Sequence, residues 1–142
     1  MLDIDEDEFP DEWKPFFNVT LLVQHPREDV DIISSELGLQ PGFVAQSQQA
    51  RRVPGTSEET AWAVTRGVAR SKRFSIVVDE YLTILEAARD YVRNLIASGG
   101  TVRMAVHLPG QGNIGDSLEP SALVRMGLLG VDLSVEVIPD MT

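Results

Sequence analysis

The stretch from residue 79 to residue 106 constrains the fold more than any other part of the chain. Apolar side chains recur in residues 79–98 at a spacing of three and four, which is the pattern of a helix with one buried stripe. They are Tyr81, Leu82, Leu85, Ala88, Val92, Leu95 and Ile96. A helix of this length spans roughly 30 Å, about the width of a small domain. It therefore needs a sheet or another helix to cover its apolar stripe.

Local signals predict the ends of this helix and the strand that follows it. Asp79 can accept hydrogen bonds from the free N–H groups of the first turn, so it is the expected N-cap. Gly99 and Gly100 can end the helix, because glycine readily adopts the left-handed conformation. Apolar and polar residues then alternate in residues 101–107, which predicts a strand that folds back under the helix.

The remaining elements are predicted from alternating apolar residues, capping residues and turns. We expect strands at residues 16–24, 43–53, 60–67, 101–108 and 131–137, and short helices at residues 29–37 and from Pro120 to Gly127 or Gly130. Asp29 is the expected cap of the first short helix, and residues 74–78 are expected to lead into the long one. This order predicts an α+β fold: a two-layer sandwich in which one long and two short helices cover a mostly antiparallel sheet, ferredoxin-like in character.

The length and the charge distribution indicate one small domain with an acidic start. A chain of 142 residues is most simply one domain, and we assign residues 16–139 to it. Residues 1–15 are expected to form a flexible tail, because seven of the first twelve residues are Asp or Glu. Such a tail could aid solubility, dock a basic partner or fold onto the arginines of its own chain.

Charge and hydropathy argue against several classes of protein. The net charge of −10 disfavours nucleic-acid binding, since the phosphate backbone attracts a positive surface. The absence of cysteine excludes a disulfide framework and a thiolate metal site. The sequence has no apolar run near 18 residues and no basic start followed by an apolar run, so neither a membrane span nor a signal peptide is expected. A cytoplasmic protein is the resulting expectation.

A glycine-rich run at residues 110–115 matches the spacing of a dinucleotide-binding fingerprint, and Asp132 follows it at a suitable distance. The context does not fit, because the third glycine of that fingerprint lies inside a helix, whereas Pro120 fixes the helix start several residues later. Asp116 and Glu119 would also repel a phosphate. We therefore predict a glycine turn and no cofactor.

The titratable residues do not form a recognisable catalytic or metal-binding set. The sequence contains two histidines, His25 and His107, too few for a histidine-rich metal site. A hydrolase set of His107, Ser117 and Asp116 is conceivable, but Ser117 lacks the nucleophile-elbow sequence. No catalytic, cofactor-binding or metal-binding residue is therefore predicted. The residues expected to form an interaction or ligand surface are Arg51, Arg52, Arg66, His107, Asn113 and Asp116.

Several short runs resemble one bacterial family. They are Leu37-Gly38-Leu39-Gln40-Pro41, Trp62, Gly112-Asn113-Ile114-Gly115-Asp116 and Leu129-Gly130-Val131-Asp132-Leu133-Ser134-Val135. With the acidic helix they look like the family catalogued as domain of unknown function 4279, over residues 19–139. That family tends to carry an aromatic residue and a basic-glycine pair near residues 44–50, which this chain replaces by other residues. The resemblance implies no established activity and no catalytic residues, and the members are similar to small immunity-type proteins in size and acidity.

Three hypotheses follow for the function. The first is a non-catalytic cytoplasmic protein-binding module, in one version an immunity protein that blocks a basic toxin. The alternative is a small-molecule-binding domain or an enzyme that uses the loop at residues 109–116 with His107 and Asp116. The third is a homo-oligomer formed through an open sheet edge.

Overall fold

The structure is a computed structural model of the chain, and it describes residues 15–47, 59–69, 73–109 and 116–138. Its strands are β1 (Pro15–His25), β2 (Phe43–Ala45), β3 (Thr60–Ala69), β4 (Thr101–Pro109) and β5 (Asp132–Ile138), and its helices are α1 (Val30–Leu37), α2 (Phe74–Ala87), α3 (Arg89–Ala97) and α4 (Pro120–Leu129). The predicted acidic tail lies outside the described residues except for Pro15, which already belongs to β1.

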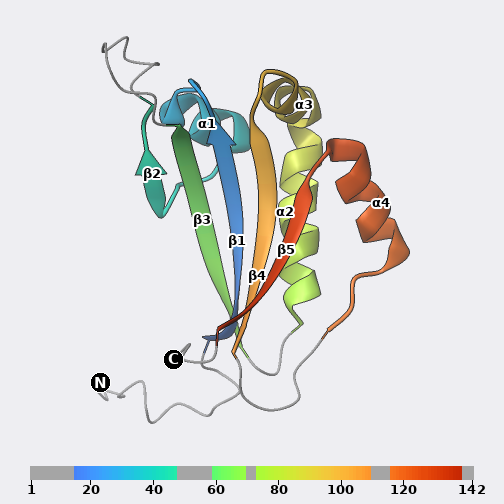
Figure 1. Cartoon of the computed structure of the whole chain (residues 1–142). Coiled ribbons are helices and arrows are strands. Elements are labelled where there is room, and N and C mark those ends of the chain that lie inside the picture. Colours follow the sequence, from blue (N-terminus) through green and yellow to red (C-terminus); the bar gives the residue numbers. More distant parts are fainter. Residues whose placement is uncertain (1–14, 48–58, 70–72, 110–115, 139–142) are drawn as a thin grey trace, which may run out of the picture.

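Within the described ranges, the strands form one sheet in the order β2-β3-β1-β4-β5, with the helices packed against one side (Figure 1). Neighbouring strands are antiparallel except β4 and β5, which run parallel. The predicted two-layer α+β sandwich with a mostly antiparallel sheet is therefore confirmed. The chain from β1 to β4 follows the β-α-β-β-α-β order of a ferredoxin-like fold when α2 and α3 are counted as one interrupted helix, and β5 is added beyond β4 through α4.

Alternation along β1 explains how the core forms. Every second side chain of this central strand points to the helices, and these positions are at most 3% exposed: Phe17, Val19, Leu21 and Val23. Trp62 of β3 lies in register with Val23 and is fully buried. Its indole N–H donates to the Ser34 Oγ of α1 at 2.9 Å, so one side chain packs in the core and ties a helix to the sheet.

The other face of the sheet is left open by the helices. Thr20 and Thr65 lie in register there, with their hydroxyl oxygens 2.8 Å apart. Leu22 also lies on this open face and is only partly buried. Because Leu22 is apolar, the sequence alone is compatible with burial of β1 on one face or on both. The hydrophobic core of the described residues therefore lies between the helices and the sheet.

The predicted start of the long helix is wrong. α2 begins at Phe74, so residues 74–78 belong to the helix and do not lead into it. Asp79 lies inside α2 and does not cap it. The Asp79 carboxylate pairs with Arg125 of α4, whose Nε also donates to Glu86 Oε1 at 3.0 Å. The acidic residues on this helix thus hold α4 beside α2.

The predicted continuity of the helix is also wrong. Ala88, with φ −109° and ψ 30°, leaves the helical conformation and separates α2 from α3. Neither proline nor glycine marks this position. Leu85 and Val92 are both fully buried across the break, because their separation of seven residues is close to two helical turns. The apolar pattern therefore continues across Ala88, although α2 and α3 are separate helices.

β2 is much shorter than the strand predicted at residues 43–53. It ends at Ala45, because the next side chain turns towards α1. Gln46 Oε1 accepts the N–H of the first residue of α1 at 2.9 Å, and its Nε2 donates to the Glu28 carbonyl oxygen at 3.0 Å. The predicted strand beyond residue 47 lies outside the described residues.

Most of the remaining helix ends agree with the sequence. Asp29 caps α1 as predicted, with its carboxylate accepting the Asp31 N–H at 2.8 Å. α4 ends at Gly130, which has φ 78°, a conformation that costs other residues strain. Gly127, the other predicted stop, lies inside the helix.

Candidate functional site

Of the surface residues predicted from the sequence, the structure describes Arg66, His107 and Asp116, and these three do not come together in one site. Arg51, Arg52 and Asn113 lie outside the described residues. Arg66 lies on the helix side of β3 and forms an ion pair with Glu80 of α2. His107 lies instead on the open face, where its Nε2 is 3.3 Å from a carboxylate oxygen of the neighbouring strand β5.

Asp116 serves as the missing cap of α2. Arg73 occupies the N-cap position of this helix without a capping side chain. Asp116 Oδ2 accepts the Ser75 N–H at 3.0 Å, and its Oδ1 accepts Arg73 Nε and the Ser117 N–H, both at 2.8 Å. Burial alone would raise the pKa of Asp116, but these hydrogen bonds outweigh it and lower the pKa to about 2. The carboxylate is a structural anion, engaged on both oxygens.

Replacing Asp116 by alanine is expected to destabilise the protein by about 1 to 2 kcal/mol near pH 7. The folded-state pKa of about 2 lies below the ordinary 3.8, so this contribution is present above pH 3.8 and is lost as the pH falls through the folded-state value. Urea unfolding from pH 7 down to pH 2 measures it. Glu119→Ala is the control, because that residue makes no capping hydrogen bond. Equal stability losses in both variants would contradict the assignment.

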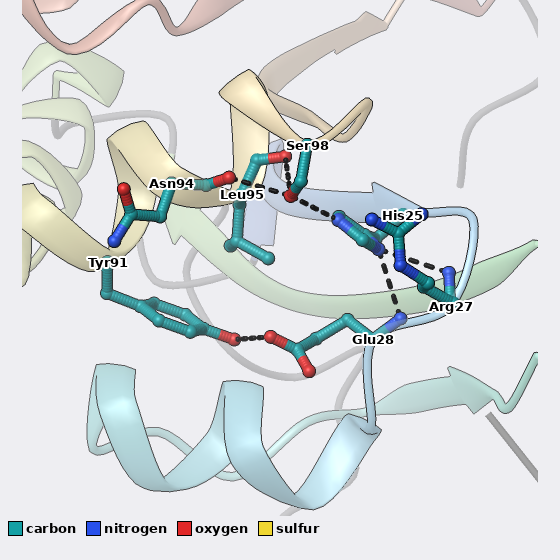
Figure 2. Close-up of a pocket in the computed structure, with 7 residues that line it drawn as sticks. All are labelled: His25, Arg27, Glu28, Tyr91, Asn94, Leu95 and Ser98. Carbon is teal, nitrogen blue, oxygen red and sulfur yellow. Dashed lines mark hydrogen bonds between the residues drawn. The ribbon is translucent and has the colours of Figure 1, made fainter.

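A groove between α1 and α3 contains two of the concavities lined by described residues. One hollow of about 350 Å³ lies at the end of β1. Its lining residues are His25, Arg27, Glu28, Tyr91, Asn94, Leu95 and Ser98 (Figure 2). The Tyr91 hydroxyl donates to Glu28 Oε2 at 3.0 Å across the groove, so α3 is tied to the loop that leads into α1.

His25 forms the buried wall of this hollow, with 5% of its surface exposed. Its Nδ1 accepts the N–H groups of Arg27 and Glu28 at 3.1 and 3.0 Å, so this nitrogen carries no proton. The proton therefore lies on Nε2, which donates to Ser98 Oγ at 2.7 Å. The Ser98 hydroxyl in turn donates to the Asn94 carbonyl oxygen at 2.7 Å. In this direction the histidine cannot remove the serine proton, so the pair is not a nucleophile and its base.

Burial lowers the pKa of His25 below its ordinary 6.5, against a smaller raising effect of the Glu28 carboxylate. Below pH 6.5 the unfolded chain therefore binds a proton that the folded protein does not. Stability contributed by neutral His25 is present above that value and is expected to fall as the pH drops towards the folded-state pKa. His25→Asn keeps an acceptor for the turn but cannot titrate. Its urea-unfolding profile between about pH 7.5 and 5 should be flatter than that of the unaltered protein, and equal slopes would contradict the prediction.

A second hollow of about 260 Å³ is also lined by Tyr91. It is lined by Glu36, Glu86, Ala87, Ala88, Arg89, Asp90 and Tyr91. Burial, the hydrogen bond to Glu28 and the nearby charges of Glu28, Glu36 and Asp29 together raise the pKa of Tyr91. The groove thus surrounds a neutral tyrosine with carboxylates.

No pattern in the sequence indicates this groove. Tyr91 and Glu28 are 63 residues apart, and the break at Ala88 that brings α3 over the loop has no proline or glycine. The described residues contain no cluster of three or more His, Cys, Asp or Glu side chains that could hold a metal ion. None of the helices in the described ranges is both long enough and apolar enough to cross a membrane.

No protein-family model, no curated protein and no solved structure matches the chain. The resemblance to domain of unknown function 4279 therefore stays a prediction.

Proposed function

We propose that this protein is a non-catalytic, cytoplasmic protein-binding module that recognises a basic partner through the groove between α1 and α3. The observation that carries the proposal is the pair of hollows that meet at Tyr91 among carboxylates. Acidic side chains in and beside the groove are Glu28, Asp29, Glu36, Glu86 and Asp90, against the cations Arg27 and Arg89. A lysine or arginine of a partner could enter between tyrosine and carboxylate.

Two of these carboxylates are available for a partner. Glu36 and Asp90 are exposed, and within the described part of the chain neither forms an ion pair. Glu86 is already held by Arg125, and Glu28 by Tyr91. The net charge of −10 would speed the encounter with a basic protein. An immunity-type protein that blocks a basic toxin is one version of this proposal.

Photo-crosslinking tests the proposed function. A photoreactive amino acid is placed at Glu36, on the wall of the second hollow, and at Glu119, an exposed acidic position at the N-cap of α4. In extract of the source organism, position 36 should give one discrete adduct with a basic protein, and position 119 should not. The adduct should disappear with Asp90→Lys and at about 0.5 M salt, where screening is strong. The same adducts from both positions, or none, would reject the proposal.

A small-molecule site in the first hollow is the second candidate. Its volume of about 350 Å³ falls at the lower end of the range for ligand pockets, and Asn94 offers it an exposed amide. A compound that shifts the NMR signals of both His25 and Tyr91, with weaker binding to Asn94→Leu, would favour this candidate. The version that uses the loop at residues 109–116 stays a prediction, because residues 110–115 lie outside the described ranges.

A further inference from the structure

Among the described residues, no strand pairs with the outer edge of the last strand. β5 is the outermost strand of the described sheet and pairs with β4 on one side. Leu133, Val135 and Val137 of β5 are in register with Met104, Val106 and Leu108 of β4. Met104 and Val106 are buried against the helices, so these β5 side chains lie on the helix side of the sheet. A strand edge in this position offers a row of N–H and C=O groups to another strand.

The apolar side chains of this strand are left uncovered. Leu133, Val135 and Val137 are 39%, 57% and 62% exposed, so the exposed fraction of these side chains increases along the strand. α4, the element that precedes β5, also exposes apolar side chains: Leu123, Val124 and Leu128. An interface of ordinary size buries about 800 Å² on each partner, so these helix residues would add to the contact that one strand can make.

The edge lacks two of the features that commonly prevent pairing, because residues 132–138 contain neither lysine nor proline. Their two charged residues lie on the open face, and each has a partner on β4. Asp132 is 3.6 Å from Arg103, and Glu136 is 3.3 Å from His107 Nε2. The carboxylates of β5 are thus each engaged by a side chain of the neighbouring strand.

Antiparallel pairing of β5 with a second β5 has one register that suits both faces. With Val135 on the twofold axis, Leu133 lies opposite Val137 of the other copy, and all seven residues of the strand are paired. Glu136 then lies opposite Ser134. With Ser134 on the axis, Asp132 would lie opposite Glu136, and like charges in direct register are unfavourable.

We propose that the protein forms a twofold dimer through β5, centred on Val135, with a second copy of this chain as the occupant of the edge. The two sheets then form one continuous sheet, and α4 of each copy flanks the junction. The proposal goes beyond the binding of a basic partner and uses a different surface. α1 packs against β3, whereas β5 is at the opposite edge of the sheet from β2 and β3 (Figure 1).

The two proposals predict opposite effects of salt on binding. Each copy carries a net charge of −10, so the copies repel, and dimerisation through an apolar edge should strengthen as the salt concentration rises. Binding of a basic partner to the acidic groove should weaken under the same change. A dimer without a basic partner, or a basic partner without a dimer, would therefore reject one proposal and leave the other standing.

Sedimentation of the full chain tests the dimer. Val135→Asp places two like charges opposite each other on the axis, and should raise the dimer dissociation constant at least about tenfold. Val44→Asp is the matched control, because Val44 is 45% exposed on β2, at the other edge of the sheet. It should leave the dissociation constant unchanged. A monomer at all concentrations and salts, or a dimer broken by Val44→Asp and not by Val135→Asp, would overturn the proposal.

Single cysteines test the register, and the natural chain contains none to interfere. Directly opposite residues of antiparallel strands have Cα atoms about 4.5 to 5.5 Å apart, which a disulfide can bridge. Val135→Cys should therefore oxidise to a covalent dimer. Ser134→Cys should not, because in this register its two copies are offset beyond the roughly 7 Å limit. Crosslinking at 134 and not at 135 would reject the register, and crosslinking at neither would reject the dimer.

Discussion

Trp62→Ala is expected to lower the free energy of unfolding by about 3 to 5 kcal/mol, a large part of the roughly 5 to 15 kcal/mol that holds a domain together. Trp62 is fully buried beside β1 and is the largest of the fully buried side chains among the described residues. Truncation removes its packing and leaves a cavity between α1 and the sheet. It also removes the donor to the Ser34 hydroxyl. The loss therefore combines lost apolar contact with an altered helix attachment.

Urea unfolding followed by circular dichroism at 222 nm measures this loss, since that signal does not depend on the tryptophan that is removed. Trp62→Phe is the control, because phenylalanine keeps most of the apolar volume and lacks only the hydrogen bond to Ser34. Its cost should be clearly smaller. If the free energy of unfolding of the Trp62→Ala protein were within about 1 kcal/mol of that of the unaltered protein, this would contradict the prediction that Trp62 contributes strongly to stability.

Gly100→Ala is expected to destabilise the fold by about 1 to 3 kcal/mol, because the added carbon has no room. A Cβ at this position would lie 2.7 Å from the Leu95 carbonyl oxygen and 2.9 Å from the Gln24 carbonyl oxygen. It would also lie 2.8 Å from His25 Cδ2. Backbone on two sides cannot yield easily, so α3 would have to move away from β1. The signals of His25 should then shift with the loss of stability.

Gly127→Ala is the matched control. This glycine lies inside α4, and a Cβ there would meet nothing within 4 Å. Alanine is the better helix former, so the variant should be stabilised by up to about 1 kcal/mol. Opposite signs at the two positions, measured by thermal or urea unfolding, would support the close approach at Gly100. Destabilisation of equal size in both would refute it.

The strands were predictable because period-two alternation matches a sheet with one covered face. β1, β4 and β5 carry that alternation clearly, and Asp29 and Gly130 marked helix ends by their capping chemistry. The exposure of the β5 side chains was not predictable. Alternation shows that Leu133 and Val135 share a face but says nothing about whether a helix covers that face.

The candidate site could not be predicted for a related reason. The break at Ala88 preserves the phase of the apolar stripe, so a straight helix and a broken one have the same pattern. The groove depends on that break. Asp116 illustrates the same limit, because the sequence places it before α4 and only the fold shows that it caps α2. Local patterns define elements, whereas sites arise from contacts between distant segments.

In a single copy, the described sheet attaches β5 to β4 alone, and this has a consequence for local opening. Within that sheet, α4 and β5 form a C-terminal unit whose strand pairing is confined to β4, whereas β1 is held by strands on both sides. The unit can detach as one cooperative piece while the three antiparallel pairings stay intact. In the monomer, amide hydrogens along β5 should then exchange with solvent much faster than those of β1, and the detachment would expose the edge of β4 before the rest of the domain unfolds.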